Sequence, residues 1–165
     1  MDSRRFITRI FGVSLCVLGS LSVTYALDRG TSGLGLPYVS GGVGSSEQVE
    51  LHQERNSYNL WLTTVAKGSG AYLVTVHVRI LDKRTQQPVL EHTLDGPWLF
   101  VELPVGRYEI EATYRESPER AQQMLKRAIT VQPRSHRQMV LRFDTRDQVG
   151  PERDAPLKAG SRDDS

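Results

Sequence analysis

The stretch LPVGRYEIEATY, Leu103–Tyr114, predicts a turn that leads directly into a β-strand. Its first four residues place proline second and glycine fourth, which suits a tight turn. Residues 107–114 then alternate polar and apolar side chains with the period of a strand that has one buried face. The residues expected to face the core are Tyr108, Ile110, Ala112 and Tyr114. The alternate residues, with Glu109 and Glu111 among them, are expected to face outward.

Six further segments have strand patterns, separated by turn residues. They span residues 58–66, 71–82, 89–94, 98–103, 122–131 and 137–143. In the second segment, alternation predicts one buried face made of Tyr72, Val74, Val76, Val78 and Ile80. The strand over 122–131 should return beside 107–114 with Leu125, Ile129 and Val131 inward and Lys126 near Glu111. The predicted fold is all-β, a seven-stranded antiparallel β-sandwich of transthyretin-like or immunoglobulin-like type.

Ahead of these strands, residues 27–44 are rich in glycine and predict an arm, and residues 45–57 predict one short helix. Ser45 is the expected N-cap, with Gln48 completing a capping box. The helix has few apolar residues, so we expect it on the surface of the 58–143 sandwich. Behind the sandwich, residues 144–165 contain ten charged residues and no aromatic, a composition typical of a disordered tail.

Residues 1–26 have the pattern of a signal peptide, with a basic start, a short apolar run and a small-residue cleavage site between Ala26 and Leu27. The alternative is an uncleaved anchor, and general secretion suits the start better than twin-arginine export. The single cysteine, Cys16, would leave with the signal. We therefore expect a periplasmic or secreted protein without disulfides and without stable membrane insertion after cleavage.

The charge of the chain argues against nucleic acid as a partner. Three of the 21 Lys and Arg residues and one of the 19 Asp and Glu residues lie within 1–26, which leaves 18 of each sign. A nucleic-acid-binding domain needs a surplus of clustered cations to release counterions from phosphates.

Three stretches carry a family resemblance: VTVHVRILDKRTQQPV (74–89), LDGPWLFVELPVGRYEIEATY (94–114) and KRAITVQPRSHRQMVLRF (126–143). The pattern resembles the carboxypeptidase regulatory-like domain of small exported proteobacterial proteins. That resemblance implies a transthyretin-like, or prealbumin-like, sandwich without catalytic activity. No histidine here is followed by a glutamate three residues on, as the associated zinc peptidases would require.

The first candidate site is the arm, where Tyr38, Gly41, Gly42 and Gly44 would dock on a protein partner or add to a sheet edge. A glycine strap packed over the sandwich is the structural alternative. An anion-binding loop is less favoured, because the arm lacks the lysine and the glycine spacing of a nucleotide-binding motif.

The second candidate site is a pair of tryptophans, Trp61 and Trp98, which could stack on a sugar. Phe100 would share a face with Trp98, and an aromatic core is the structural alternative. The four histidines are scattered, so we expect no metal ion and no other cofactor. We also expect no catalytic residue, since no nucleophile-turn motif is present.

The sequence as a whole predicts an exported, non-catalytic module for protein interaction or cell-envelope architecture, with an unknown protein partner in the envelope. A carbohydrate- or peptidoglycan-binding module is the second hypothesis. A divergent transthyretin-like hydrolase is the third, although that family ends in a Tyr-Arg-Gly-Ser tetrapeptide and this chain does not.

Overall fold

The computed structural model describes residues 27–146. The predicted signal peptide and residues 147–165 of the predicted tail lie outside this range. The elements are β1 (Asp28–Thr31), β2 (Pro37–Gly41), α1 (Ser45–Glu54), the 3₁₀ turn η1 (Arg55–Ser57), β3 (Leu60–Ala66), β4 (His77–Asp82), β5 (Pro88–Thr93), β6 (Trp98–Val101), β7 (Gly106–Tyr114), β8 (Gln123–Val131) and β9 (Arg137–Phe143).

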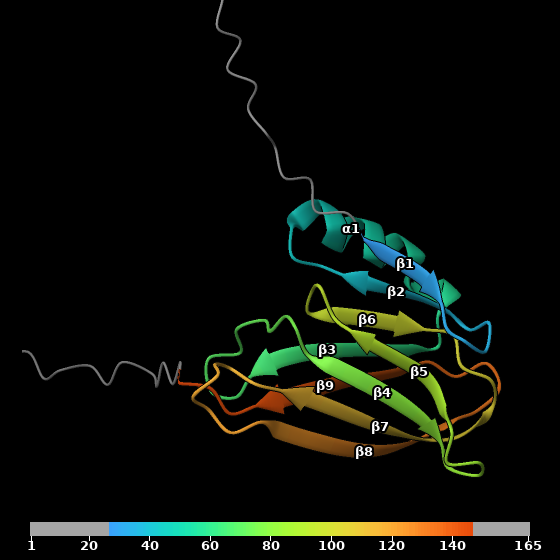
Figure 1. The fold of residues 1–165 in the computed structure, drawn as a ribbon. Coiled ribbons are helices and arrows are strands. Elements are labelled where there is room, and N and C mark those ends of the chain that lie inside the picture. The colour runs from blue at the N-terminus through green and yellow to red at the C-terminus, as the bar shows by residue number, and fades with distance from the viewer. Residues whose placement is uncertain (1–26, 147–165) are drawn as a thin grey trace, which may run out of the picture.

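The strands form two facing sheets (Figure 1), which confirms the prediction of a mainly β, two-layered fold. Sheet A has the order β1-β2-β6-β3-β9 and sheet B the order β5-β4-β7-β8. The number of strands is corrected from seven to nine across the described residues, because the glycine-rich arm supplies β1 and β2.

The prediction of a purely antiparallel sandwich is also wrong in one place, since β9 runs parallel to β3. Both strands begin at the same end of the molecule. Strand β9 returns from the loop after β8, and β3 starts just after η1, so the two run in the same direction (Figure 1). All the other strand pairs among the described residues are antiparallel.

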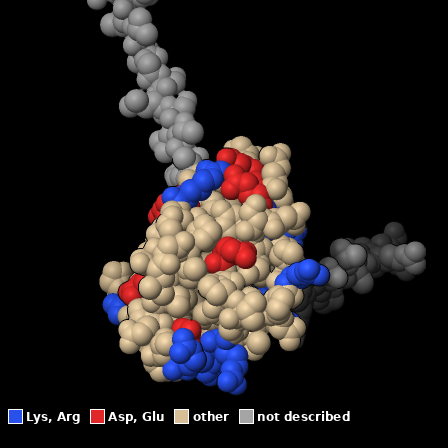
Figure 2. Space-filling model, turned by 90° about the vertical axis from the view of Figure 1, so that its right-hand side faces the viewer, with Lys and Arg blue, Asp and Glu red and all other residues tan. Residues whose placement is uncertain are grey.

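One end of the sandwich is made of four loops, residues 32–36, 83–87, 102–105 and 132–136, and is called the four-loop end below (Figure 1). Figure 2 looks at this end and shows mostly uncharged atoms, with one group of Lys and Arg at the lower edge and others at the top and on the right. The opposite end holds the loop after β3, the loop between β7 and β8, and the close of β9.

The stretch Leu103–Tyr114 behaves as its pattern predicts. Tyr108, Ile110 and Ala112 are buried, and Tyr114 packs against the same core. At the preceding turn, the Asn59 side-chain amide accepts from the Leu103 N–H at 2.9 Å and donates to its carbonyl at 2.7 Å. The side-chain amide of Asn59 therefore fixes the entry to β7, because it satisfies both backbone groups of a buried residue.

The predicted partner of β7 is also confirmed. In the β7–β8 register Glu111 lies opposite Lys126, and the two side chains form a charge-assisted hydrogen bond. Arg79 Nη1 of β4 donates to the other Glu111 oxygen at 3.1 Å. The Lys126 hydrogen bond is the main reason that the pKa of the Glu111 carboxyl lies below its usual value, against the opposing effect of burial.

The predicted strand over residues 71–82 is corrected, because only residues 77–82 form β4. Thr75 has a φ of 57°, a conformation that breaks a strand. Ahead of it, the Leu73 N–H donates to the Thr64 carbonyl at 3.0 Å, and the Thr64 hydroxyl donates to the Leu73 carbonyl at 2.7 Å, so this segment lies against sheet A. Val76 and Val78 face the core as predicted, whereas Tyr72 is 53% exposed and Val74 is exposed as well.

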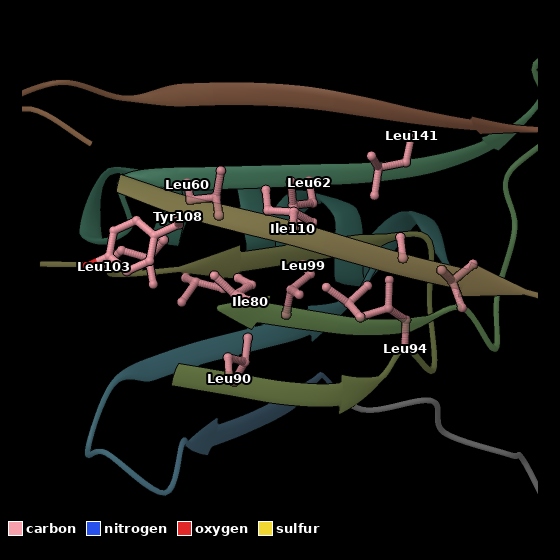
Figure 3. Packing of buried hydrophobic residues seen from close by; sticks show 14 of the residues in the cluster. Leu60, Leu62, Ile80, Leu90, Leu94, Leu99, Leu103, Tyr108, Ile110 and Leu141 are labelled. Carbon is pink, nitrogen blue, oxygen red and sulfur yellow. The ribbon is translucent and has the colours of Figure 1, made fainter. Parts of the chain in front are cut away.

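The main core fills the space between the two sheets (Figure 3), where side chains such as Leu62 from β3 and Ile110 from β7 point toward each other. A second, smaller apolar cluster lies on the other face of sheet A, under α1. Its members are Leu27, Val39, Leu51, Tyr58, Trp98 and Phe100, with Trp61 partly buried at its side.

Helix α1 covers this second cluster with Leu51, which is fully buried, so its place on the outside of the sandwich agrees with the prediction. Its start differs from the prediction. Ser45 is already helical, and Gly44, which has no side chain to cap with, is the N-cap residue. Glu47 instead accepts from the N–H groups of Gly42 and Val43 at 2.8 and 3.1 Å, because the carboxylate reaches back over the first turn.

Candidate functional site

The arm does not offer a free surface at Tyr38 and Gly41, because Tyr38 is paired with both β1 and β6, and Gly41 is paired with β6 and covered by Leu27. Tyr38 lies opposite Val101 of β6, and Gly41 lies opposite Trp98. The ring of Tyr38 contacts that of His92 on β5, with centroids 4.8 Å apart, so it helps to close this side of the sandwich. The arm does add to a sheet edge, but the sheet is the protein's own: β2 pairs with β6 of sheet A.

The next glycine of the arm shapes the surroundings of Trp98. Gly42 has a φ of +94°, and a Cβ built there would lie 3.2 Å from the Trp98 ring. An alanine at this position would meet both the strained backbone and the indole. Gly44 has ordinary φ and ample room. A side chain at position 42 would therefore disturb Trp98, whereas one at position 44 would not.

Trp98 and Trp61 both lie on the outer face of sheet A, on neighbouring strands, and not in the core between the sheets. Phe100 of β6 is stacked with Trp98 at an interplanar angle of 14° and lies 6.3 Å from Trp61. The aromatic alternative to a binding site is therefore half right, since these rings pack together but do so at the outer surface.

Each tryptophan is partly covered by neighbours. Trp98 is 9% exposed, with His52 of α1 packed edge-on at 5.2 Å and Tyr72 at 6.1 Å. Above Trp61, the Arg55 guanidinium carbon lies 4.0 Å from the ring centroid, and His136 stacks at 5.1 Å. Neither ring presents the open, flat face that a sugar needs for stacking.

The Trp61 N–H has no capacity left for a ligand. It donates to the backbone oxygens of Arg55 and Tyr58, both at 2.9 Å. These bonds fix the indole on the 3₁₀ turn and hold the Arg55 side chain above it. Trp61 is therefore a rigid wall of the site, with its polar atom already satisfied.

Between these rings and β9 lies a groove of about 230 Å³, called the aromatic groove below. Its lining residues are His52, Arg55, Trp61, Thr63, Val65, Tyr72, Trp98, Phe100, Gln138 and Val140. The lining is mainly aromatic and apolar, Arg55 and Gln138 supply hydrogen-bond donors, and no lining residue is a carboxylate. This volume is smaller than the roughly 300–1,000 Å³ of sites for drug-sized molecules, so it suits one large apolar side chain.

The aromatic groove opens beside the free edge of β9. Arg137 donates its N–H to Asn59 and Phe143 accepts from Lys67, so the odd-numbered residues of β9 direct their backbone groups toward β3. In a parallel ladder the intervening residues face the other way. Gln138 and Val140 therefore combine backbone groups at the edge, which pair with no residue of the range 27–146, with side chains in the groove.

At the end of the same edge, the backbone groups are hydrogen-bonded to a side-chain amide. Just beyond β9, the Asp144 N–H donates to the Gln123 side-chain oxygen at 2.9 Å, and the Gln123 amide donates to the Asp144 carbonyl at 2.6 Å. The side-chain amide thus occupies the place of a neighbouring strand. It also holds the first residues of the predicted tail against the sandwich.

The other three edge strands within residues 27–146 are protected against pairing. Strand β1 is only four residues long and its Arg29 is paired with Glu50 and Glu54 of α1. Strand β5 begins at Pro88, and β8 carries Lys126 and Arg127 at its centre. Charges, proline and short strand length are the usual means of blocking edge-to-edge association. Strand β9 is seven residues long, and its central residues 138–141 include no charge and no proline.

Three lining residues of the aromatic groove were not predicted as site residues: Tyr72, His52 and Arg55. Tyr72 reaches the groove because the chain leaves sheet A at Thr75. His52 reaches it from α1, which packs on β2 and contacts Trp98 of β6 through this histidine, and Arg55 follows in η1. The only sequence signal was the glycine pair of residues 68 and 70, which indicated a turn but not its direction.

Comparisons with protein-family models, with curated proteins and with solved structures find no match to this chain. The resemblance to carboxypeptidase regulatory-like domains therefore remains a prediction. Within residues 27–146, no cluster of three or more His, Cys, Asp or Glu is placed to hold a metal ion. No helix in the same range is long and apolar enough to cross a membrane.

Proposed function

We propose that this protein is a non-catalytic module of the cell envelope that binds an extended segment of a partner protein along β9. One apolar side chain of that segment would enter the aromatic groove. The envelope location rests on the predicted signal peptide, and the absence of catalysis rests on the sequence pattern and the family resemblance. The observation that carries the binding site is the double role of Gln138 and Val140, at a free edge and in a groove.

Binding by strand addition would use both features found at β9, the backbone groups of its edge and the aromatic groove beside it. Backbone hydrogen bonds to an added strand give affinity without sequence preference, and pockets for alternate side chains give specificity. An apolar or aromatic anchor in a small, well-packed pocket is also typical of the residues that dominate binding energy. The aromatic groove supplies such a pocket, and its walls are held rigid by the contacts of Trp61 and Trp98.

A glycan is the second candidate, and the geometry favours it less. Arg55 and His136 cover the Trp61 ring, and Trp98 is almost fully buried. Among the arm residues predicted to dock on a partner, 38–44, the exposed one is Val43, which lies with Gly44 in the turn outside β2.

The test begins with a random-peptide display selection on the purified protein. We expect the selected peptides to share one large apolar residue within an extended segment. On binding, amide hydrogen exchange should slow at Gln138, Val140 and Arg142, whose N–H groups face the free edge. Thr63→Arg, which fills the aromatic groove, should weaken binding by about tenfold or more.

The matched control is Met124→Arg, which places the same side chain on the exposed face of the β8 edge. It should leave peptide affinity unchanged. Peptides that bind Thr63→Arg as well as they bind the original protein would overturn the site. A glycan array whose hits are blocked by Thr63→Arg, with no peptide selected, would replace a protein partner with carbohydrate.

A further inference from the structure

A second hollow lies away from the aromatic groove, at the four-loop end of the molecule, and is called the end groove below. It has a volume of about 1250 Å³ and is open to solvent. Its walls come from the loop between β1 and β2, the loop between β4 and β5, the start of β7 and the end of β8. It shares no lining residue with the aromatic groove.

The floor and one rim of the end groove are apolar. Tyr108 and Val131 are buried at the floor, and the Tyr108 hydroxyl is used up by a 2.8 Å bond to the Pro104 carbonyl. Burial raises the pKa of that hydroxyl, so it stays neutral. On the rim, Leu34 is 64% exposed and Val105 is 65% exposed. Large apolar side chains exposed beside an apolar hollow indicate a binding surface.

The other rim is basic. The Lys83 N–H donates to the Arg107 carbonyl at 2.9 Å, which joins the loop after β4 to the start of β7, and Lys83, Arg84 and Arg107 all line the end groove. Lys83 lies 3.9 Å from Glu109, but Arg84 and Arg107 form no ion pair with any acid in the described part of the chain. The nearby Asp82 carboxylate accepts from the N–H groups of Arg84 and Thr85, so it is engaged by its own loop.

We propose that the end groove binds an anionic amphiphile with a single acyl chain, a fatty-acid-like ligand. The acyl chain would lie on the floor between Leu36 and Ile129, and the carboxylate would pair with Arg84 and Arg107. Guanidinium groups bind carboxylates through paired hydrogen bonds, and burial of the acyl chain against apolar side chains contributes favourable free energy. A free inorganic anion would leave the apolar floor unused, and a neutral lipid would leave both guanidinium groups unpaired.

The probe for this site is parinaric acid, a fatty acid whose fluorescence rises in an apolar environment, used below its critical micelle concentration. We expect a saturable rise with the purified protein and a weaker one with parinaric acid methyl ester, which lacks the charge. Arg84→Glu with Arg107→Glu should weaken parinarate binding by about tenfold or more, because both pairing groups are reversed.

The matched control reverses two cations at the opposite end of the sandwich, Lys67→Glu with Arg115→Glu, and should bind parinarate like the original protein. A third variant, Leu34→Ser with Val105→Ser, should lower affinity without altering the charge. Thermal unfolding should be unchanged in all three variants, since these side chains are exposed.

Three results would overturn the proposal. One is equal affinity for the acid and its methyl ester, and another is equal loss in the charge-reversed variant and its control. The third is binding to phosphatidylglycerol vesicles without binding to monomeric parinarate, which would make this end a membrane-docking surface and not a ligand site.

Discussion

Strands β8 and β9 follow each other in the chain and form the edges of opposite sheets, yet they treat their free edges differently. At the centre of β8, Lys126 and Arg127 are charged, and Lys126 is tied to Glu111 of the neighbouring strand. The centre of β9 holds Gln138, Met139 and Val140 without a charge. Within residues 27–146, the edge of β8 is thus protected against pairing, and the centre of the β9 edge lacks that protection.

The two strands also differ in how firmly they are anchored. Strand β9 places Leu141 and Phe143 fully inside the core. Strand β8 contributes Leu125 and Ile129, which are only partly buried, and Val131 at its end. An edge that is to accept a partner strand gains from rigidity, because less conformational entropy is lost on binding.

The largest expected effect is the difference in stability lost when one leucine of each strand is shortened to alanine. Leu141→Ala should lower the free energy of unfolding by about 3 kcal/mol, since it opens a cavity at a fully buried site. Leu125→Ala should cost about 1 kcal/mol, because its side chain is only partly removed from water. Urea unfolding followed by circular dichroism measures both, and equal losses would contradict the difference in anchoring.

The second-largest effect should come from a substitution at the free edge of β9 that leaves the core unchanged. Arg142→Pro removes an N–H that faces away from β3, so no bond of the β3–β9 ladder is lost. Stability should change little, while affinity for a peptide selected on the purified protein should fall about tenfold with the loss of its backbone bond. Isothermal titration gives the affinity. Unchanged affinity would show that partners do not pair with this end of β9.

A third prediction concerns the pair that protects β8. The pKa of Glu111 is lowered in the folded protein, chiefly by its hydrogen bond from Lys126. Its carboxylate therefore stabilises the fold above the unfolded pKa of about 4.3, and this contribution is lost as the pH falls through the folded pKa. At pH 7, Glu111→Gln should be less stable by about 1 kcal/mol, a modest figure because both cationic partners are partly exposed.

The pH series decides this point. The difference in urea midpoint between the original protein and Glu111→Gln should be constant near neutrality and shrink below about pH 4. Lys126→Met, which removes the main partner, should remove most of that pH dependence. A difference that stays constant down to about pH 2 would show that packing and not charge holds the side chain of Glu111.

Local patterns predicted the centre of sheet B well. Alternation along residues 107–114 gave the buried face of β7. After the loop 115–122, β8 returns beside it in the predicted register, with Glu111 opposite Lys126. These features depend on neighbours in sequence and on the period of a strand. The sequence did not predict that Arg79 of β4, the other neighbour of β7, also donates to Glu111.

Long-range contacts account for the features that the sequence did not predict. The glycine-rich composition of residues 27–44 indicated a loose arm, but pairing with β6, distant in sequence, makes β2 a strand. Likewise, nothing within residues 71–82 shows that Thr64 will hold Leu73 and interrupt the strand at Thr75. The aromatic groove depends on both of these events. The sequence therefore predicted Trp61 and Trp98 as candidate site residues, but not Tyr72, His52 and Arg55 beside them.

The smallest effect tests how the wall of the groove is built. Arg55→Ala removes the cation above Trp61 but keeps the Arg55 carbonyl that accepts from the indole. The free energy of unfolding should fall by about 0.5–1 kcal/mol, the usual strength of an exposed cation–π contact. Tryptophan emission should shift to longer wavelength as water reaches the ring. Arg55→Lys keeps a cation and should lie between the two, whereas a lysine variant no better than alanine would assign the contact to guanidinium stacking rather than to charge.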